Sequence, residues 1–533
     1  MKHFDLCVYG GTSAGVTAAV EAARRGLRIA LVEPGRHLGG MSSGGLGCTD
    51  FGNRDVIGGL SREFYARLGR HYGQPLSWTF EPHVAERVFE DFVSEHDIIV
   101  LRNHRVVGVE KTAGRIERIV FEHVPTDEIN APVAAPATAR RVPLIARAFI
   151  DTSYEGDLMA RAGVGFTVGR EAQAQYGEPH NGVRHETLQH QFAVPVDPYV
   201  VPGDAASGLL PLISPGSGGT PGAGDRLVQA YNFRLCLTRN SANQHPIEPP
   251  DRYDPKRFEL LARYLCAIAR RQRPLRLHRL VMAISPMPGG KTDINNSNAF
   301  STDFIGGSWA YPDADYAARG RIWHEHLDYT RGLLHFLATS TEIPEELNAE
   351  MATWQLCRDE FEDTGGWPHQ LYVREARRMV GPVVLTEADC QPPYDSNDAV
   401  GMAAYTMDSH NCQRIVQHGV VRNEGDVQVR PAQPYPVSYR AITPHPQQCQ
   451  NLLVPVCLSA SHIAFGSIRM EPVFMVLGQS AAVAACLSLE TNCAVQAVPR
   501  DSLRDQLLGV GQVLEYDPTG KPVLCGNPEL QPI

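Results

Sequence analysis

The sequence lacks several features that assign a long chain to a functional class. Its 12 cysteines include no C-x-x-C pair, so neither a zinc knuckle nor a vicinal redox disulfide is indicated, and we expect no metal site. Acidic residues outnumber basic ones, 59 to 49, and the net charge of −10 argues against a nucleic-acid partner. Several cysteines stand in apolar runs, which is typical of buried, reduced thiols: Cys7, Cys236, Cys266, Cys457 and Cys486.

Long apolar stretches are also scarce, and we expect no leader. No apolar run approaches the roughly 18 residues that a membrane-spanning helix requires. Met1, Lys2 and His3 leave no room for a signal peptide before the first predicted strand. We therefore expect a soluble, cytoplasmic protein without a membrane partner. Its 533 residues, 43% of them hydrophobic, suggest two or more domains.

The first residues contain a strand, a glycine turn, a helix and a second strand. Residues 4–9 are apolar enough for a strand covered on both faces. Gly10 permits the tight turn that follows, and Gly15 lets the alanine-rich helix pack closely on the strand. The helix N-terminus, at Ser13 and Ala14, offers N–H groups and a partial positive charge to a pyrophosphate. The second strand ends at Glu33, which can accept hydrogen bonds from ribose hydroxyls, so the pattern predicts dinucleotide binding.

The turn departs from the dinucleotide pattern at one position. G-x-G-x-x-G has glycine in third place, where this chain has Thr12. The strands, the helix and the terminal acid keep their register, so we favour a nucleotide site over a glycine turn that only packs.

The segment after Glu33 indicates which dinucleotide binds. Residues 34–47 are too glycine-rich for the second crossover helix of an NAD domain, and a backbone with few Cβ atoms can approach a flat ring system. The segment resembles the bacterial FAD-dependent oxidoreductases of the glutathione-reductase-like (GR2-type) superfamily, whose members carry E-P-G-x-x-L-G-G-M-x-x-G-G-L. The residues that carry this resemblance, and that it implies as flavin contacts, are Pro34, Gly39, Gly40, Met41, Gly44 and Gly45.

Two later segments support the resemblance. Residues 146–158 resemble the second flavin fingerprint, in which a strand ends beside the cofactor. Residues 457–485 resemble the closing flavin helix, whose N-terminus would point at the pyrimidine end of the ring system and stabilise reduced flavin. The resemblance implies FAD as the cofactor and adds these contacts: Asp151, Gly156, Gly466, Arg469, Glu471, Gly478 and Gln479.

The predicted fold is α/β, with a chain that leaves the flavin domain and returns to it. Residues 1–165 form the N-terminal part of a Rossmann-like FAD-binding domain, with a parallel sheet and a β-meander over residues 100–121. Residues 166–430 form an inserted, mixed α/β substrate domain, and residues 431–533 complete the FAD domain. Helices are predicted at 254–272, 312–339 and 345–361. A surface hairpin tip is predicted at 125–139 and a long loop at 202–224.

A flavin enzyme that oxidises an alcohol or amine needs a base near the substrate, and histidine suits this role near neutral pH. His462 stands in the segment that the resemblance places at the flavin's edge. His410 has Asp408 two residues away, on the same side of an extended segment. We expect one of these two histidines to be the base. His445, between two prolines, fits a rigid turn better.

Cationic and amide groups can fix the substrate. Lys291, with Asp293, Asn295 and Asn296, stands in a glycine-led loop that suits a polyol or a carboxylate, or else a structural turn. Arg440 and Arg374 can bind an anion, although an ion pair with a neighbouring acid is favoured for Arg374. Cys48 follows the glycine run, but no cysteine nearby in the sequence favours a redox role for it.

The sequence therefore predicts an FAD-dependent dehydrogenase or oxidase. Its substrate would be a small, polar, hydroxylated molecule, such as a sugar or an organic acid, and an unidentified acceptor would reoxidise the flavin. The alternative is a lyase or isomerase that keeps the flavin without net redox chemistry. A flavin-bearing sensor and an NAD-only dehydrogenase are further alternatives. A homo-oligomer is compatible with all of these.

Overall fold

The first βαβ unit forms as predicted and begins a parallel sheet. The computed structural model describes residues 3–517. Strand β1 (His3–Tyr9) lies parallel to β2 (Ile29–Glu33) on one side and to β6 (Arg140–Asp151) on the other, and β3 (Ile98–Arg102) extends the sheet beyond β2. The β1 and β2 side chains are almost all buried, which explains their continuous apolar sequence.

Strand β6 belongs to two sheet types at once. Its first half pairs antiparallel with β5 (Arg115–His123), which pairs with β4 (His104–Thr112), while its second half pairs parallel with β1 and with β22 (Leu452–Leu453). The meander is therefore β4–β5–β6, and the prediction that it begins near residue 100 is wrong, because β3 joins the parallel sheet. The pairing of β22 with β6 shows that the chain returns to this sheet near its C-terminal end.

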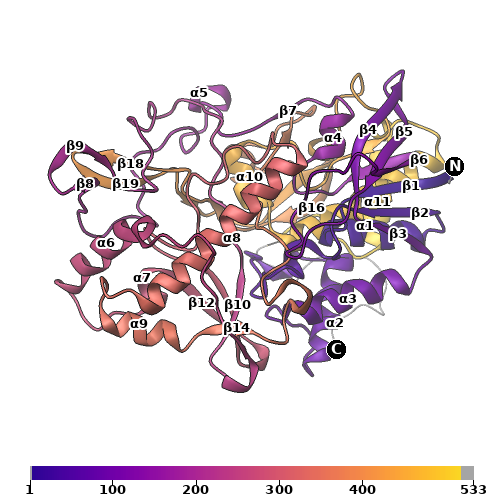
Figure 1. Cartoon of the computed structure of the whole chain (residues 1–533). Coiled ribbons are helices and arrows are strands. Elements are labelled where there is room, and N and C mark those ends of the chain that lie inside the picture. The colour runs from indigo at the N-terminus through magenta and orange to yellow at the C-terminus, as the bar shows by residue number, and fades with distance from the viewer. Residues whose placement is uncertain (1–2, 518–533) are drawn as a thin grey trace.

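Helices pack on the parallel sheet, and one of them lies at the nucleotide-binding end of that sheet. Helix α1 (Ser13–Arg24) packs on α11 (Glu471–Glu490), and α2 (Gly59–His71) and α3 (Pro82–Ser94) lie beside them. Figure 1 shows α11, in yellow, next to α1 and the indigo strands. The short α4 (Asp157–Arg161) follows β6, α10 (His462–Ile468) precedes α11, and α12 (Arg500–Gly509) follows it.

Helix α11 corrects the expectation that no segment is long and apolar enough to cross a membrane. By length and composition it passes that test, and it is the one helix in residues 3–517 that does. Its apolar window is 94% buried inside the protein, as in a core helix.

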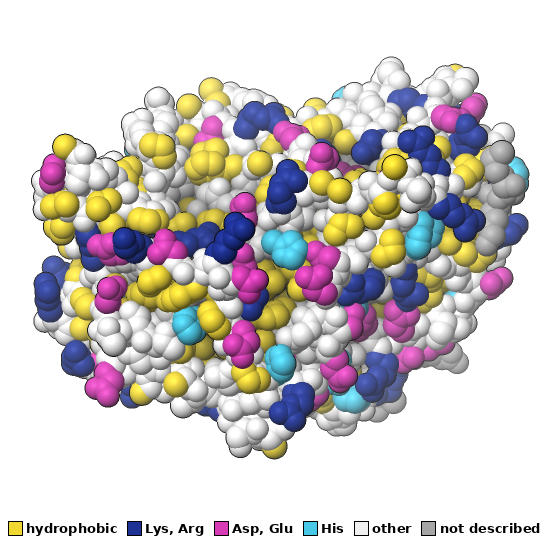
Figure 2. Space-filling view, viewed as in Figure 1, with side chains coloured by type: hydrophobic (Ala, Val, Ile, Leu, Met, Phe, Trp, Pro, Cys, Tyr) yellow, Lys and Arg dark blue, Asp and Glu magenta, His cyan; other side chains and the backbone are white. Residues whose placement is uncertain are grey.

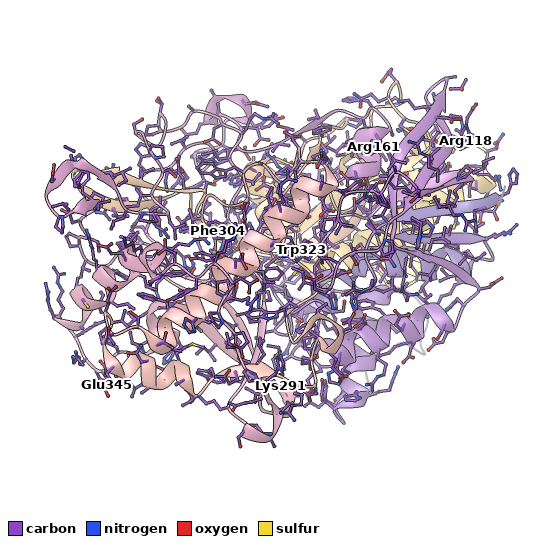
Figure 3. All side chains as sticks on the ribbon, in the orientation of Figure 1. Arg118, Arg161, Lys291, Phe304, Trp323 and Glu345 are labelled. Atoms are coloured by element: carbon purple, nitrogen blue, oxygen red, sulfur yellow. The ribbon has the colours of Figure 1, made fainter. Side chains whose placement is uncertain are left out.

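The second part of the chain is built around an antiparallel sheet. Its strand order is β11 (Gln244–His245), β14 (Gln355–Cys357), β10 (Leu235–Thr238), β13 (Lys291–Asn296) and β12 (Met282–Met287). Helix α8 (Tyr316–Thr339) runs between this part and the flavin part, with Trp323 near its middle (Figures 1 and 3). The other helices of this part are α5 (Gln173–Tyr176), α6 (Glu259–Ala269), α7 (Leu277–Leu280) and α9 (Glu345–Ala352).

Short strand pairs complete the fold between these two parts. Several of them bring segments far apart in the sequence together, as where β7 (Phe166–Thr167) meets β15 (Arg378–Met379). On the face seen in Figure 2, basic and acidic side chains are interspersed. The remaining strands are β8 (Tyr199–Val201), β9 (Asp204–Leu209), β16 (Ala399–Ala403), β17 (Met407–Ser409), β18 (Gln413–Gln417), β19 (Val420–Glu424), β20 (Val427–Val429) and β21 (Tyr435–Ser438).

Three local predictions need correction. The segment 125–139 is not only an exposed tip, because Ile129, Asn130 and Ala131 are buried. The segment 202–224 is not a plain loop, because it contains β9, which pairs with the preceding β8 as a hairpin. The helix predicted over 345–361 ends at Ala352, and β14 follows.

Candidate functional site

A pocket opens where the parallel strands end, as expected for a dinucleotide-binding sheet, and its empty space amounts to about 610 Å³ when the open solvent at its mouth is included. The β1–α1 turn contributes Gly10 and Thr12, and the end of β2 contributes Glu33 and Pro34. The opposite wall comes from α8 and the segment before it, through Tyr311, Tyr316, Arg319 and Trp323. The remaining lining residues are Gly35, Thr126, Asn130, Pro132, Ser153, Tyr154, Glu155, Asp157 and Gln370.

Thr12 explains the departure from the glycine pattern. Its hydroxyl accepts a hydrogen bond from the N–H of Gly15 at 3.3 Å and donates to the carbonyl of Thr152 at 2.9 Å. It therefore caps α1 and ties the turn to the end of β6. Gly15 has no room for a side chain, because a Cβ there would lie 1.9 Å from the Gly10 carbonyl oxygen.

Glu33 stands at the place where ribose hydroxyls would bind. Its carboxylate accepts hydrogen bonds from the N–H groups of Gly11 at 2.6 Å and Gly35 at 2.5 Å. Burial raises the pKa of Glu33 to about 7, because these two bonds only partly offset the loss of solvation. A hydroxyl donor from a ligand would favour the ionised form.

Glu471, in the first turn of α11, joins three other segments. Its carboxylate accepts hydrogen bonds from Ser13 at 2.5 Å, Ser42 at 3.3 Å and Tyr154 at 2.6 Å. Burial raises its pKa to about 7, although the three hydroxyl donors lower it. The helix start, the glycine-rich loop, the turn after β6 and the closing helix thus meet at one side chain.

The glycine-rich loop lies between the pocket and the second part of the chain. The N–H of Met41 donates to the Tyr154 hydroxyl at 2.9 Å. A Cβ at Gly44 would lie 2.3 Å from Cβ of Gln370, and one at Gly45 would lie 2.1 Å from the carbonyl oxygen of Arg234. Gly39 and Gly40 both have positive φ, 98° and 56°, which suits residues without a side chain.

Other residues that the resemblance implied as flavin contacts have packing roles in the structure. Asp151 accepts hydrogen bonds from Ser153 and Met159, so it shapes the turn after β6, where Gly156 begins α4 with φ 66°. Gly478 packs on α1, where a Cβ would lie 2.2 Å from the carbonyl oxygen of Ala14. Gly466 packs on the backbone of Asp408. The Gln479 side-chain amide accepts hydrogen bonds from Leu60 and Gln512 and donates one to Glu21, so both its oxygen and its nitrogen already have partners.

A buried polar cluster lies on the other side of the glycine-rich loop, centred on Tyr372. The guanidinium carbons of Arg374, Arg234 and Arg469 lie 4.7, 6.0 and 5.8 Å from its ring centroid. Each arginine has an acidic partner: Arg374 pairs with Asp303 at 2.9 Å, Arg234 with Asp293 at 2.6 Å and Arg469 with Asp408 at 2.9 Å. We define the polar cluster as Tyr372, these six charged residues, His410 and Asn232.

The structure brings His410 into this cluster between two acids. Nδ1 lies 2.7 Å from Asp303 and Nε2 lies 3.3 Å from Asp408, so the predicted pair with Asp408 forms. Burial and Arg374 lower the pKa of His410, but the two carboxylates raise it further, and the net shift is upward. The two carboxylates therefore favour the protonated form of the ring.

His462 has a different environment, at the start of α10. Its Nδ1 lies 2.8 Å from Glu375, and its Nε2 is buried without a hydrogen-bond partner among residues 3–517. Burial alone would raise the pKa of Glu375, but His462 and Arg378 lower it to about 2. Gln229 links the two histidines, because it donates to Glu375 at 2.9 Å and accepts from the backbone N–H of His410 at 3.1 Å.

Two residues predicted to hold the substrate lie in ion pairs outside the polar cluster. Lys291 is buried among Glu81, Asp359 and Glu360, at 2.8, 2.9 and 2.6 Å, near the lower edge of the molecule in Figure 3. Arg440 has a 44% exposed side chain and pairs with Asp398 at 2.8 Å.

The other residues of the loop predicted around Lys291 have two roles: some form structural hydrogen bonds, and some contact the polar cluster. Asp293 accepts both Arg234 bonds and one from the N–H of Cys48, and Asn295 lies between Asn232 and Arg374. Burial raises the pKa of Cys48, which disfavours a thiolate. Arg374 forms the favoured ion pair, with Asp303 instead of the adjacent Glu375.

Comparison with known proteins decides the family. The family model described as FAD dependent oxidoreductase matches residues 5–507. The chain belongs to this FAD-dependent oxidoreductase family. The match confirms the expected oxidoreductase class and FAD as the cofactor of this oxidoreductase.

Solved structures resemble only part of the chain. The OxyS anhydrotetracycline hydroxylase from Streptomyces rimosus is 11% identical with a TM-score of 0.24, over 32% of this chain and 36% of that one. A flavoprotein/dehydrogenase from Cytophaga hutchinsonii is 13% identical with a TM-score of 0.23, over 31% and 42%. The matched region thus spans less than half the length of these proteins, and no curated protein is significantly similar to the oxidoreductase.

The residues of this oxidoreductase fit FAD at its nucleotide end. The turn at Gly10 leaves no space for a side chain, since a Cβ would lie 2.6 Å from the N–H nitrogen of Ser153, and the pocket beside it is lined by the Glu33 carboxylate. Sequence reasoning missed the α8 wall and Tyr372. The aromatic and basic residues at 311–323 were a signal that could have indicated the α8 wall, whereas nothing in the local pattern around Tyr372 indicates a ligand.

Proposed function

We propose that the oxidoreductase removes a hydride and a proton from a small, polar, hydroxylated molecule, such as a sugar or an organic acid. FAD, when bound, supplies the acceptor for the hydride. The observation that carries the proposal is the free Nε2 of His462, a buried base whose other nitrogen is held by Glu375.

In this proposal His462 takes the hydroxyl proton at Nε2. Because Glu375 accepts the Nδ1 proton, the lone pair of the ring lies on Nε2, the nitrogen that has no hydrogen-bond partner among residues 3–517. The Glu375 carboxylate, ionised because its pKa is about 2, then stabilises the imidazolium that forms. This division of roles between the two nitrogens favours His462 over His410 as the base.

His410 suits a different task. Since both of its nitrogens face carboxylates, which raise its pKa, it suits donation of a proton to a substrate oxygen, or it fixes the positions of Asp303 and Asp408. With an acid at each nitrogen, the ring has no nitrogen left to accept a substrate proton.

The polar cluster supports a polar substrate. Buried polar atoms normally have partners, yet Nε of Arg374, Nε of Arg469 and Oδ1 of Asn232 have none among the described residues. These donors and this acceptor, next to an aromatic ring, match the mixed hydrogen-bonding groups of a polyol or hydroxy acid. The glycine-rich loop separates this cluster from the nucleotide pocket. A flavin ring would lie along that loop.

Anaerobic mixing with a panel of sugars, hydroxy acids and amines tests this function. We expect at least one sugar or hydroxy acid to bleach the flavin absorbance. A lyase or isomerase that retains the flavin would convert its substrate while the oxidised flavin spectrum stays unchanged. Turnover of that kind, with no bleaching by any candidate, would contradict the proposal.

Further proposals concern the context of the enzyme. We divide the chain into residues 1–165 and 431–533, the FAD-binding domain, and residues 166–430, an inserted substrate domain; the pairing of β22 with β6 supports this division. We also propose membership of the GR2-type bacterial flavoproteins, a cytoplasmic location, an independent electron acceptor and a homo-oligomeric state.

A further inference from the structure

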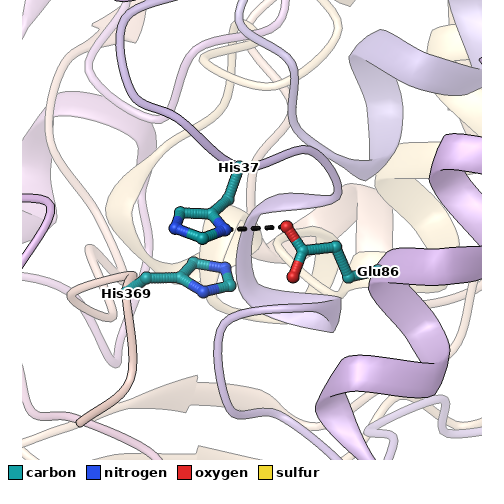
Figure 4. A group of neighbouring side chains, drawn as sticks. All are labelled: His37, Glu86 and His369. Atoms are coloured by element: carbon teal, nitrogen blue, oxygen red, sulfur yellow. Dashed lines mark hydrogen bonds and ion pairs between the residues drawn. The ribbon is translucent and has the colours of Figure 1, made fainter. Parts of the chain in front are cut away.

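Two histidines and a carboxylate meet beside the glycine-rich loop, outside the proposed catalytic groups. His37 follows β2, Glu86 lies on α3 and His369 lies in the second part of the chain, just before Gln370. The ligand atoms that they can offer all lie within 4.8 Å of one another. Figure 4 shows His37 above His369, with the Glu86 carboxylate to one side of the two rings and a dashed line from it to His37.

His37 lies between two carboxylates. Nδ1 lies 2.7 Å from Glu86, and Nε2 on the opposite edge lies 3.1 Å from the carboxylate of Asp363, although Nε2 makes no hydrogen bond among residues 3–517. Metal-binding histidines usually donate their second N–H to a carboxylate, and Asp363 is near enough to accept that bond once the ring turns. Asp363 is 51% exposed and Glu86 is 27% exposed, so the cluster is reachable from solvent.

His369 is a buried imidazole with few partners. It is 2% exposed, and the one hydrogen bond that its ring makes among residues 3–517 is a 3.5 Å contact between Nε2 and the hydroxyl of Ser43.

We propose that His37, Glu86 and His369 bind one zinc ion, which joins the flavin loop to the second part of the chain. Two imidazoles and a carboxylate are a donor set that zinc takes, with a fourth position left to water. Ligand atoms about 2.1 Å from a tetrahedral ion lie about 3.4 Å apart, and the present separations, 2.7 Å for His37–Glu86 and at most 4.8 Å overall, lie on both sides of that value.

Zinc binding requires one movement. The two rings are stacked, with centroids 3.8 Å apart and an interplanar angle of 4°, whereas an ion lies near the plane of each imidazole that binds it. The rings must therefore turn apart. Arg36, 3.4 Å from Asp363, adds a positive charge at the rim of the site. The carboxylates of Glu86 and Asp363 offset this charge and the charge of the ion.

The second histidine–carboxylate group of the described chain provides a control. Glu81, His83 and Glu360 also lie close enough to share an ion. The Lys291 ammonium lies 2.8 Å from Glu81 and 2.6 Å from Glu360, so a fixed cation already occupies that space. We expect no zinc there.

Zinc titration of the full-length, FAD-loaded enzyme after chelator treatment tests the proposal. Elemental analysis after desalting should find one zinc per chain, and zinc should raise Tm. Asp363→Asn should weaken binding by about 10- to 100-fold, Glu86→Gln and His369→Ala by more, and His83→Ala not at all. The visible flavin spectrum shows that each variant is folded.

Two results would overturn the proposal. One is wild-type enzyme that retains no zinc after desalting. The other is folded, flavin-loaded His369→Ala and Glu86→Gln enzyme that binds zinc as tightly as the wild type. The proposed oxidation does not depend on either result, because His37, Glu86 and His369 take no part in it.

Discussion

At the scale of single residues, the same side chain has different roles in different surroundings. His462 has one nitrogen bonded to Glu375 and one without a hydrogen-bond partner among residues 3–517, whereas His410 has an acid at each nitrogen. His445 lies in a turn, where its backbone carbonyl accepts hydrogen bonds from the N–H groups of Gln448 and Cys449. Sequence position indicated His462 and His410 as candidates. The choice between them depends on the partners Glu375 and Asp303, which are 87 and 107 residues away.

His462→Gln tests the proposed base. Without a proton acceptor, we expect flavin reduction by the best substrate to slow by about 10²- to 10⁴-fold, with unchanged FAD content. Stopped-flow absorbance measures the rate, and the pH dependence of that rate should flatten.

Glu375→Gln and His445→Gln are the companion variants. A neutral amide at position 375 cannot stabilise the imidazolium as a carboxylate does, so the rate should fall less than in His462→Gln while its pH profile shifts. His445→Gln should match the wild type. A His462→Gln enzyme that reduces at the wild-type rate would exclude His462 as the base.

At the scale of elements, strong local patterns were predictable and close contacts were not. The β1–α1–β2 unit and α11 follow from apolar runs and a glycine turn. The β8–β9 hairpin was missed because its strands are short and largely exposed, so they lack the alternation that marks a strand. The bulk of α8 was predicted, but its role as the pocket wall was not, because a helix pattern does not say what the helix faces.

Gly478→Ala tests the contact between α1 and α11. A Cβ there would lie 2.2 Å from the backbone of Ala14, so the first turn of α1 must move. We expect the free energy of unfolding to fall by about 1–3 kcal/mol and FAD to bind more weakly. Chemical denaturation and FAD titration measure the two effects.

Gly509→Ala on α12 is the matched control, since a Cβ at Gly509 meets no atom within 4 Å. Higher helix propensity should leave the protein equally or slightly more stable, by up to about 1 kcal/mol. Equal behaviour of the two variants would mean that α1 and α11 separate at no cost.

At the scale of the whole molecule, Glu471 shows how distant segments meet. Its partners Ser13, Ser42 and Tyr154 belong to three segments, and the carboxyl group is buried among them with a pKa of about 7. Because this pKa is raised above its ordinary value of 4.5, the folded state binds the proton more tightly than the unfolded state. The resulting stability is complete below pH 4.5 and is lost as the pH rises through about 7.

Glu471→Gln should therefore remove a pH-dependent penalty. As the pH rises from 5 to 8, the free energy of unfolding of the variant should increase by about 1–3 kcal/mol relative to that of the wild-type apo-protein, because only the wild type must ionise a buried carboxyl group. Thermal unfolding of both proteins at the two pH values measures this difference. A difference that shrinks toward pH 8 would mean that Glu471 is already ionised at low pH.

The sequence by itself determined the nucleotide-binding start, the return to the flavin fold, the family and the cofactor. The nucleotide-binding start follows from local patterns, in which backbone freedom at glycine and apolar periodicity act over a few residues, whereas the family and the cofactor follow from the resemblance of whole segments. Only the tertiary structure decided that Lys291 and Arg440 lie in ion pairs, that three arginines surround Tyr372, and that His462 keeps a free nitrogen. Such environments depend on burial and on partners from distant segments, and the residues adjacent in the sequence give no information about either.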